Sequence, residues 1–374
     1  MPTIDELLTF AVKSDASDLF IKAYSPPLVR IYGDLVPMRM DPLTREEAQA
    51  LSYEILDQGE IDRFERELEL DLAYEIPAVS RFRVNLFCQR GCIQSVFRAI
   101  PFRIATMEEL NLPDICRDFC GRPRGLVLVT GPAGSGKSTS LAAMINFINE
   151  RFPLHIVTVE DPLEFIHTDK MSLINQRGLA EDTHSFANAL KFVLRQDPDV
   201  ILVGEMRDLE TIGLAITAAE TGHLVFATLH TKDAVQTVDR VIDVFPTHQQ
   251  QQVRMQVSVN LQGIISQTLV KKADGSGRVA AFEVMDAIPA VRSMIREAKT
   301  YQVGSIVQTG SRKGMQTLDQ SLAQLVIKGI VKYEDAYQKA SVPTEFEAIV
   351  REHQDEQARA PAPGGPRAAD ARPR

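Results

Sequence analysis

The sequence has no tryptophan, few other aromatic residues and fewer basic than acidic side chains. Of its 374 residues, 6% are aromatic, and 41 Lys and Arg stand against 50 Asp and Glu, so the formal net charge is −9. General nucleic-acid binders usually present a basic surface, and single-strand translocases also use aromatic side chains that stack on bases. A DNA helicase or translocase is therefore a distant alternative, and we expect no nucleic-acid partner.

Long apolar runs are also missing. No stretch approaches the roughly 18 apolar residues that span a bilayer. The first ten residues, MPTIDELLTF, carry acids where a signal peptide would carry Lys or Arg. We therefore expect a cytoplasmic protein, and docking onto a membrane-embedded partner stays open.

Cysteine occurs only four times, as two C-x-x-x-C pairs at Cys88, Cys92, Cys116 and Cys120. Structural zinc sites favour other spacings, commonly C-x-x-C, and disulfides are rare in a reducing compartment. A zinc site is one alternative, but we expect four small buried side chains.

The first hundred residues have the pattern of a small α+β domain. Capping boxes that begin at Thr3 and Thr44 predict two helices. Alternating apolar segments on either side of Gly33 and of Gly91 predict strands joined in hairpins. We therefore predict a domain over residues 1–100.

The pattern changes in the second part of the chain. After a predicted linker at 101–113, the apolar segments GLVLVTG, HIVTVED, VILVGE and HLVFATLH alternate with helical segments. This alternation predicts an α/β domain with a mostly parallel sheet and helices on both faces. We assign residues 114–355 to this domain, which ends in helices. Residues 356–374, rich in Pro, Ala, Gly and Arg, are predicted to be disordered.

A glycine-rich stretch, GPAGSGKS, stands between a predicted strand and a predicted helix. In this context the pattern G-x-x-x-x-G-K-S specifically indicates a phosphate-binding loop, and a glycine-rich turn without a ligand is the alternative. Lys137 would contact the β- and γ-phosphates of ATP, and the hydroxyl of Ser138 would ligate Mg²⁺. Backbone N–H groups and the helix N-terminus would surround the phosphate oxygens. The residues expected to bind the nucleotide are Gly131, Pro132, Ala133, Gly134, Ser135, Gly136, Lys137, Ser138 and Thr139.

Two groups of acids follow later strands. Glu205 comes directly after VILVG, at a strand end that faces the nucleotide in open α/β sheets. It would hold Mg²⁺ through a water or orient the attacking water, and the alternative is a surface acid paired with Arg207. In TVEDPLEF, Glu160, Asp161 and Glu164 follow another strand, and hydrolysis needs a carboxylate that positions or deprotonates water. Spacing does not select that carboxylate, and a solvated surface acid is the alternative for each.

Two histidines, His223 and His230, flank the apolar segment LVFATL. A lone histidine is more often structural than catalytic. Two of them beside a phosphate loop indicate that at least one senses the γ-phosphate.

The stretches GPAGSGKS, VTVEDPLEF, VGEMRD and TGHLVFATLHT together resemble the motif set of the secretion-type hexameric ATPases. They are most similar to the type IV pilus retraction ATPases of the PilT/PilU family. ASDLFI, SRFRVNLF, TMEELNLP, AVRSMIRE and GMQTLDQSL resemble the same branch, so the likeness covers nearly the whole chain up to about Glu352.

This resemblance implies a fold, an activity and partners. The fold would be a PAS-like first domain joined to a RecA-like core, with six copies in a ring and ATP bound between the two domains near the neighbouring subunit. The activity would be ATP hydrolysis that drives pilus retraction and twitching motility. The partners would be an inner-membrane platform protein and a paralogous retraction ATPase. The motor would lie at the cytoplasmic face of the inner membrane.

The resemblance also implies roles for the acids and histidines. The family itself has Glu at the position of Glu205. The family pattern points to Glu164 as the base that activates water, with Glu160 beside it. It implies that both His223 and His230 belong to the active site.

The resemblance also implies a role for arginines of the first domain. Arg81 and Arg83 share one face of a predicted strand, and Arg98 lies on the next strand. The family analogy suggests that Arg83 and Arg98 reach the γ-phosphate as arginine fingers, across subunits. Solvated arginines on an open sheet face are the alternative.

The chain also departs from the family pattern. NQRGLAED has Gly178 where retraction ATPases commonly have an acid, and AVRSMIRE, residues 290–297, has Val and Ser-Met where Ile and Asn-Leu are usual. The alternatives are an accessory retraction paralogue, a non-enzymatic ring subunit, and the pilus assembly or type II secretion branch. That last branch usually has a longer N-terminal extension and a late four-cysteine metal insert.

Overall fold

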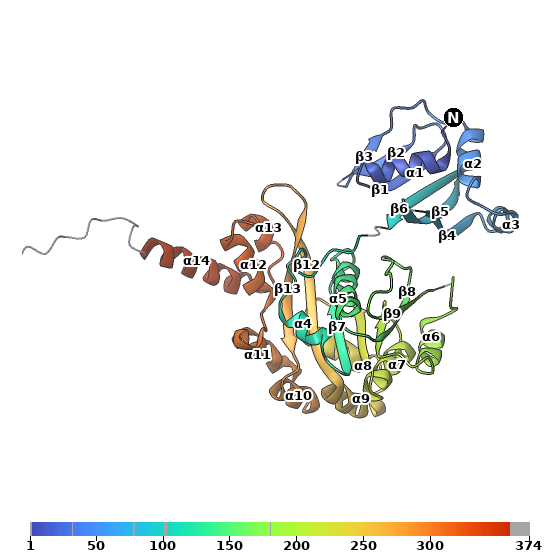
Figure 1. Cartoon of the computed structure of the whole chain (residues 1–374). Helices are drawn as coiled ribbons and strands as arrows, with labels where there is room; N and C mark the ends of the chain where they lie inside the picture. Colours follow the sequence, from blue (N-terminus) through green and yellow to red (C-terminus); the bar gives the residue numbers. More distant parts are fainter. Residues whose placement is uncertain (1, 32, 78, 101–102, 180, 360–374) are drawn as a thin grey trace, which may run out of the picture.

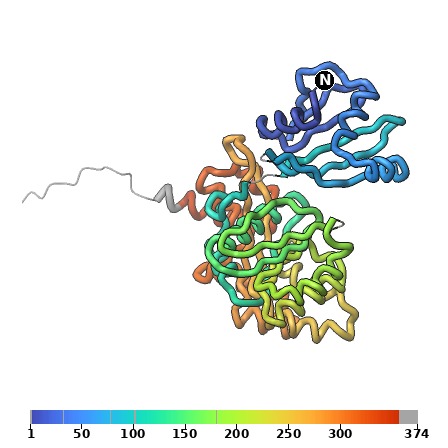
Figure 2. The backbone as a smooth tube through the Cα atoms, turned by 45° about the vertical axis from the view of Figure 1, so that its right-hand side comes forward, coloured from blue at the N-terminus to red at the C-terminus, as the bar shows by residue number. Residues whose placement is uncertain are grey.

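The computed structural model describes residues 2–31, 33–77, 79–100, 103–179 and 181–359, with side chains up to residue 355. These residues form two sheets, one from strands β1 to β6 and one from strands β7 to β13. Figure 2 shows a blue first body above a green-to-red second body. None of the helices in the described part of the chain is both long and apolar enough to cross a bilayer.

The first sheet is antiparallel, in the order β3-β2-β1-β6-β5-β4. Both predicted capping boxes are present, and the helices begin at Ile4 and Arg45. Apolar side chains of these helices and of one sheet face form a single core. The elements are α1 (Ile4–Lys13), β1 (Ala16–Lys22), β2 (Leu28–Ile31), β3 (Asp34–Pro37), α2 (Arg45–Tyr53), α3 (Gln58–Glu67), β4 (Glu69–Ile76), β5 (Ser80–Gln89) and β6 (Cys92–Ile100).

The second sheet has the order β13-β12-β7-β11-β10-β8-β9 (Figure 1). Its strands are parallel except for the antiparallel pair β12 and β13. Helices α4 and α5 cover one face, and α6 to α9 cover the other. The elements are α4 (Ile115–Cys120), β7 (Gly125–Thr130), α5 (Lys137–Arg151), β8 (His155–Glu160), β9 (Leu173–Gly178), α6 (Phe186–Val193), β10 (Val200–Val203), α7 (Leu209–Glu220), β11 (Leu224–Leu229), α8 (Ala234–Asp243), α9 (Thr247–Asn260), β12 (Leu261–Lys271) and β13 (Arg278–Asp286).

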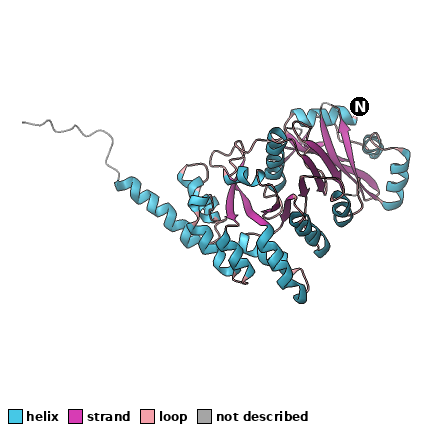
Figure 3. Cartoon of the chain, turned by 60° about the horizontal axis from the view of Figure 1, so that its bottom comes forward, coloured by secondary structure: helices cyan, strands magenta, loops and turns pink. Residues whose placement is uncertain are grey.

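A helical part follows the second sheet and extends from one side of it (Figure 3). Its last helices pack on the β12–β13 hairpin through a separate apolar cluster. The expected fold class is confirmed. The last helix continues to Arg359, so the segment predicted to be disordered begins inside it, and residues 360–374 lie outside the described residues. The elements are α10 (Pro289–Arg296), η1 (Thr300–Gln302), α11 (Val303–Thr309), η2 (Ser311–Lys313), α12 (Leu318–Ile327), α13 (Tyr333–Tyr337) and α14 (Pro343–Arg359).

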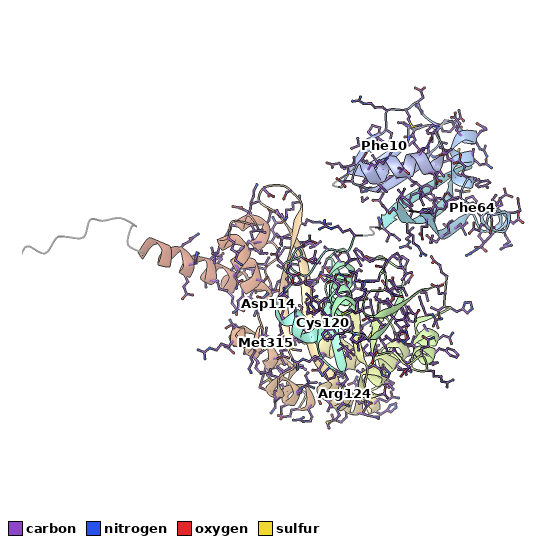
Figure 4. All side chains as sticks on the ribbon, viewed as in Figure 1. Phe10, Phe64, Asp114, Cys120, Arg124 and Met315 are labelled. Carbon is purple, nitrogen blue, oxygen red and sulfur yellow. The ribbon has the colours of Figure 1, made fainter. Side chains whose placement is uncertain are left out.

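The cysteines do not all behave as predicted. Cys92, Cys116 and Cys120 are buried, and burial raises the pKa of Cys116 to about 12. Cys88 is exposed, so the expectation of four buried thiols is wrong for this residue. Cys120 lies within the second body (Figure 4), whereas Cys88 and Cys92 lie on the β5–β6 hairpin of the first. Within the described ranges, no group of three or more His, Cys, Asp or Glu could hold a metal ion.

Candidate nucleotide site

The loop between β7 and α5 has a backbone that only glycine accommodates. Gly131 has φ +142°, and a Cβ there would lie 2.3 Å from the carbonyl oxygen of Gln267. Gly136, with φ +89°, is the N-cap of the 15-residue helix α5. Because these glycines let the chain curl closely at the end of β7, the loop leads directly into the positive end of a helix dipole.

The side chains of the loop fit a polyphosphate. Lys137 is mostly buried, and its Nζ lies 2.9 Å from the carbonyl oxygen of Gly131 and 3.2 Å from that of Pro132. The Oγ of Ser135 is buried without a hydrogen-bond partner among the described residues. Burial lowers the pKa of Lys137, while the negative charges of Glu205 and Glu164 raise it. A cation and an unsatisfied hydroxyl in one glycine cradle are the donors that phosphate oxygens require.

The parallel strands bring the other predicted groups to this edge. Leu229 at the end of β11 pairs with Thr130 at the end of β7, and Val203 at the end of β10 pairs with Val159 of β8. The residues that follow these strand ends therefore lie side by side. This places Glu160, Glu205 and His230 around the phosphate loop, as expected for the carboxyl edge of an open α/β sheet.

Glu205 links two partners. Its Oε1 lies 3.0 Å from Nε2 of His230, and its Oε2 accepts a hydrogen bond of 2.7 Å from Arg207. The Nδ1 of His230 lies 3.4 Å from Nζ of Lys137. The Arg207 hydrogen bond is the main cause that lowers the pKa of Glu205. Glu205 thus has the Arg207 pairing of the surface-acid alternative, and it also joins a polar chain that reaches the phosphate loop.

The two glutamates of the β8 loop have different environments. The carboxylate of Glu160 accepts hydrogen bonds from Thr158 (2.7 Å) and Gln176 (3.4 Å), and burial raises its pKa to about 7. Glu164 is exposed, and its charge acts on both Lys137 and Glu160. An exposed carboxylate near the loop can bind a water, whereas the carboxylate of Glu160 is buried and already accepts two hydrogen bonds from the protein.

The two histidines lie at opposite edges of the sheet. His230 follows the carboxyl end of β11, whereas His223 precedes that strand and its Nδ1 bonds to the carbonyl of Ala218 (2.9 Å). The carbonyl of His223 accepts from the N–H of Gly125, where β7 begins. Six residues of strand separate the histidines by roughly 20 Å. His223 therefore lies at the opposite edge of the sheet from the phosphate loop of its own chain, and the prediction that both histidines belong to the active site stays a prediction.

The arginines of the first sheet are neighbours on its open face. Arg83 and Arg98 are paired in register between β5 and β6. The guanidinium of Arg98 donates to the buried carboxylate of Asp18 (2.9 Å), and Arg81 pairs with Glu181 of the second body (2.9 Å). In the ranges that the structure describes, neither Arg83 nor Arg98 has a hydrogen bond or ion pair to the phosphate loop. Within a single chain, the two predicted arginine fingers, Arg83 and Arg98, therefore do not contact the phosphate loop.

Glutamines that the sequence reasoning missed support the site. Gln176 of β9 accepts from the N–H of His167 (2.7 Å) and donates to the carbonyl of Phe165 (2.8 Å), so its amide holds the loop that carries Glu164. Gln267 of β12 is buried and donates to the carbonyl of Ser135 in the phosphate loop (2.8 Å). For Gln267 the available signal was a polar residue within the mostly buried strand β12, whereas β9 is too polar for Gln176 to stand out.

Known proteins match this chain over most of its length. The model of the family described as "Type II/IV secretion system protein" matches residues 1–351. The chain is 52% identical over 343 residues to the "Type IV pilus retractation ATPase PilT" of Pseudomonas aeruginosa, which covers 92% of this chain and 99% of that protein. It is 51% identical over 334 residues to a "Twitching motility protein" of Neisseria gonorrhoeae, with 89% of each chain covered. The crystal structure of the pilus retraction motor PilT with bound ADP superposes with a TM-score of 0.87 and 45% identity, over 93% of this chain and 100% of that one.

Proposed function

The chain belongs to the Type II/IV secretion system protein family, and from that premise we propose that it is the ATP-hydrolysing motor of type IV pilus retraction. The observation that carries the proposal is the polar chain from Lys137 through His230 to Glu205 at the phosphate loop. The relatives named above, a retraction ATPase and a twitching motility protein, support the same activity.

ATP is the substrate that the cradle fits. The residues Gly131, Pro132, Ala133, Gly134, Ser135, Gly136, Lys137, Ser138 and Thr139 would surround the phosphates. Ser138, and Glu205 directly or through a water, would hold Mg²⁺, and the ion would supply positive charge that offsets the charge of the phosphates. The unsatisfied hydroxyl of Ser135 supports this assignment, because buried polar groups normally have partners.

Glu164 is the proposed base. Its exposed carboxylate would orient the attacking water and accept its proton. Glu160 would be a supporting group, because its buried carboxylate already accepts hydrogen bonds from Thr158 and Gln176. Gln176 would keep the intervening loop in place through its two backbone hydrogen bonds.

His230 would respond to the nucleotide. Its ring lies between the ammonium of Lys137 and the carboxylate of Glu205, so a change of charge at the loop alters both of its contacts. This differential contact is what a ligand needs in order to bias a two-state arrangement of domains.

Arg83 and Arg98 would complete the site from a neighbouring copy. Six copies in a ring would place the open arginine face of one first domain against the nucleotide of another subunit. The proposed setting is the cytoplasmic face of the inner membrane, where the ring would act on a pilus platform protein, with a paralogous retraction ATPase as a further partner.

The experiment combines turnover with a cellular phenotype. Purified protein should hydrolyse ATP, and Lys137→Ala and Glu205→Gln should each lose at least about 10²-fold in kcat. Deletion of the gene should leave surface pili but abolish twitching. Wild-type turnover in the Glu205→Gln variant would contradict the catalytic assignment, and loss of pilus assembly would point to the assembly branch.

A further inference from the structure

The segment that carries Glu164 connects β8 to β9 over residues 161–172, and residues 163–169 within it have no regular secondary structure. Its backbone therefore lacks the neighbouring strand or helix that usually provides partners for N–H and C=O groups. Two side-chain amides take that place. One belongs to Gln176 of β9, and the other belongs to Asn149 in the last turn of α5.

The amide of Asn149 holds the later part of this segment. Its Nδ2 donates to the carbonyl of Thr168 (2.8 Å), and its Oδ1 accepts from the N–H of Lys170 (3.0 Å). The amide of Gln176 contacts the preceding part with the same spacing, one carbonyl and one N–H two residues apart. A neighbouring parallel strand would bond the same pair of groups. Two amides thus replace a strand along the segment.

Asn149 is anchored more firmly than the residues that it holds. Its side chain is fully buried, whereas Thr168 and Lys170 are exposed. Its own carbonyl accepts from the N–H groups of Met171 (2.8 Å) and Ser172 (3.3 Å), where the segment meets β9. The segment is therefore fastened to a helix that packs in the apolar core of the second body, and not to another loop.

The same helix carries the phosphate loop at its other end. α5 begins at Lys137, whose ammonium lies in the glycine cradle, and it ends at Arg151, two residues after Asn149. The backbone hydrogen bonds of a helix make it a rigid rod. One element therefore sets the position of the phosphate loop and also the position of the segment that carries Glu164.

We propose that Asn149 is a positioning residue for Glu164, which it keeps in place by holding the exposed segment against the helix of the phosphate loop. The inference rests on the proposed function, in which Glu164 activates the attacking water. Gln176 fixes the residues next to Glu164, and Asn149 prevents the rest of the segment from moving away from α5. Turnover depends on this attachment, because a displacement of about 1 Å can cost about 10²-fold in rate.

Asn149→Ala tests the attachment. It removes both bonds of the amide and leaves the backbone bonds between α5 and the segment. Asn146→Ala is the matched control, because Asn146 is also a buried asparagine of α5 and also contacts Lys170, but through the ammonium group (2.8 Å) and not through the backbone. The control therefore reproduces the change in the helix and leaves the backbone of the segment attached.

Steady-state turnover and ATP titration of the assembled protein measure the effect. Asn149→Ala should lower kcat about tenfold or more, and the Kd for ATP should stay within about twofold because Lys137 lies at the other end of the helix. Asn146→Ala should change neither quantity by more than about twofold. Hydrogen exchange over residues 165–172 should become about tenfold faster in Asn149→Ala alone, the effect of losing about one hydrogen bond.

A double variant tests whether Asn149 acts through Glu164. In the Glu164→Gln background the base is already removed, so Asn149→Ala should lower the residual kcat by less than about twofold. Residues that act as one unit are not additive. A merely structural role of Asn149 would instead lower kcat by the same factor in both backgrounds.

Three results would overturn the inference. They are a wild-type kcat in Asn149→Ala, an equal loss of kcat in Asn146→Ala, and the same factor of loss with and without the Glu164 carboxylate. Failure of the proposed function is distinguishable, because the wild type would then lack ATP turnover or Glu164→Gln would turn over ATP as fast as the wild type.

Asn149→Asp keeps the inference testable if the alanine variant does not fold. Its carboxylate has the shape of the amide and still accepts from the N–H of Lys170, and it loses only the donor to Thr168. It should lower kcat by about threefold or more, again with the Kd for ATP within about twofold. Unfolding of both variants would show that Asn149 is needed for folding itself and would overturn the positioning role.

Discussion

The two sheets of this molecule differ in how their charged side chains are paired. In the second sheet, apolar strands covered on both faces end at one edge, where Lys137, His230 and Glu205 contact one another. In the first sheet one face is covered by helices, and the other carries arginines. Arg98 has the buried partner Asp18, but Arg83 has no ion pair among the described residues.

This difference indicates which part of the nucleotide site is complete within a single chain. The cluster in the second sheet is held together within the chain, and it leaves the ammonium of Lys137 and the unpartnered hydroxyl of Ser135 to bind an anion. Arg83 has no such partner among the described residues, and an exposed, weakly hydrated guanidinium is well suited to bind a phosphate of a partner that arrives from outside. Four measurements test this difference between the sheets, in order of decreasing expected effect.

The largest effect is expected from the first sheet. Arg83→Ala should lower the ATP turnover of the assembled ring about 10³-fold, the lower end of what arginine fingers contribute. Arg81→Ala is the matched control on the same strand face, already paired with Glu181, and should change little because exposed ion pairs contribute about 0–1 kcal/mol. Equal losses in the two variants, measured as steady-state kcat, would remove the contrast between the sheets.

The next effect concerns the second sheet. Glu164→Gln should lower kcat about 10²-fold or more with little change in ATP binding, because a positioned base contributes about 10²–10⁴-fold. Asp161→Asn is the control in the same loop, since Asp161 lies near Arg207 (3.8 Å). Nucleotide titration and turnover measure both quantities, and a larger loss in Asp161→Asn would reassign the base.

A pH effect on stability should come from Glu160. Its pKa is raised by burial from 4.5 to about 7, so the folded state binds the proton more tightly than the unfolded state. Its stabilising contribution is therefore present below pH 4.5 and is lost as the pH rises through about 7. Against Glu160→Gln, the free energy of unfolding of the wild type should fall by about 3 kcal/mol across this window in urea titrations. Parallel pH curves for the two proteins would show that Glu160 is already ionised.

The smallest effect separates the two edges of the second sheet. His230→Ala should lower kcat about tenfold, because a hydrogen bond to a charged group contributes about 1.5–3 kcal/mol. His223→Ala should leave turnover within about twofold. A loss of similar size in His223→Ala would mean that this residue reaches a nucleotide in a neighbouring subunit, as the prediction that both histidines belong to the active site allows.

Local patterns predicted much of the molecule. The capping boxes at Thr3 and Thr44 begin helices as expected, and the phosphate loop lies between strand and helix. These features depend on residues a few positions apart, whose spacing follows from the geometry of one turn or one strand. The supporting roles of Gln176 and Gln267 were not predictable in this way, because their partners lie outside their own strands, 9 and 11 residues away for Gln176 and 132 residues away for Gln267.

The sequence by itself determined the phosphate loop, the acids that follow the strands and the α/β class, because periodicity and short motifs act over neighbouring residues. Only the tertiary structure decided that His230 and not His223 joins Lys137, and that Arg98 is anchored while Arg83 is free. Strand order and direction decide which strand ends meet at one edge of the sheet. Both depend on the packing of the whole domain rather than on any local stretch of sequence.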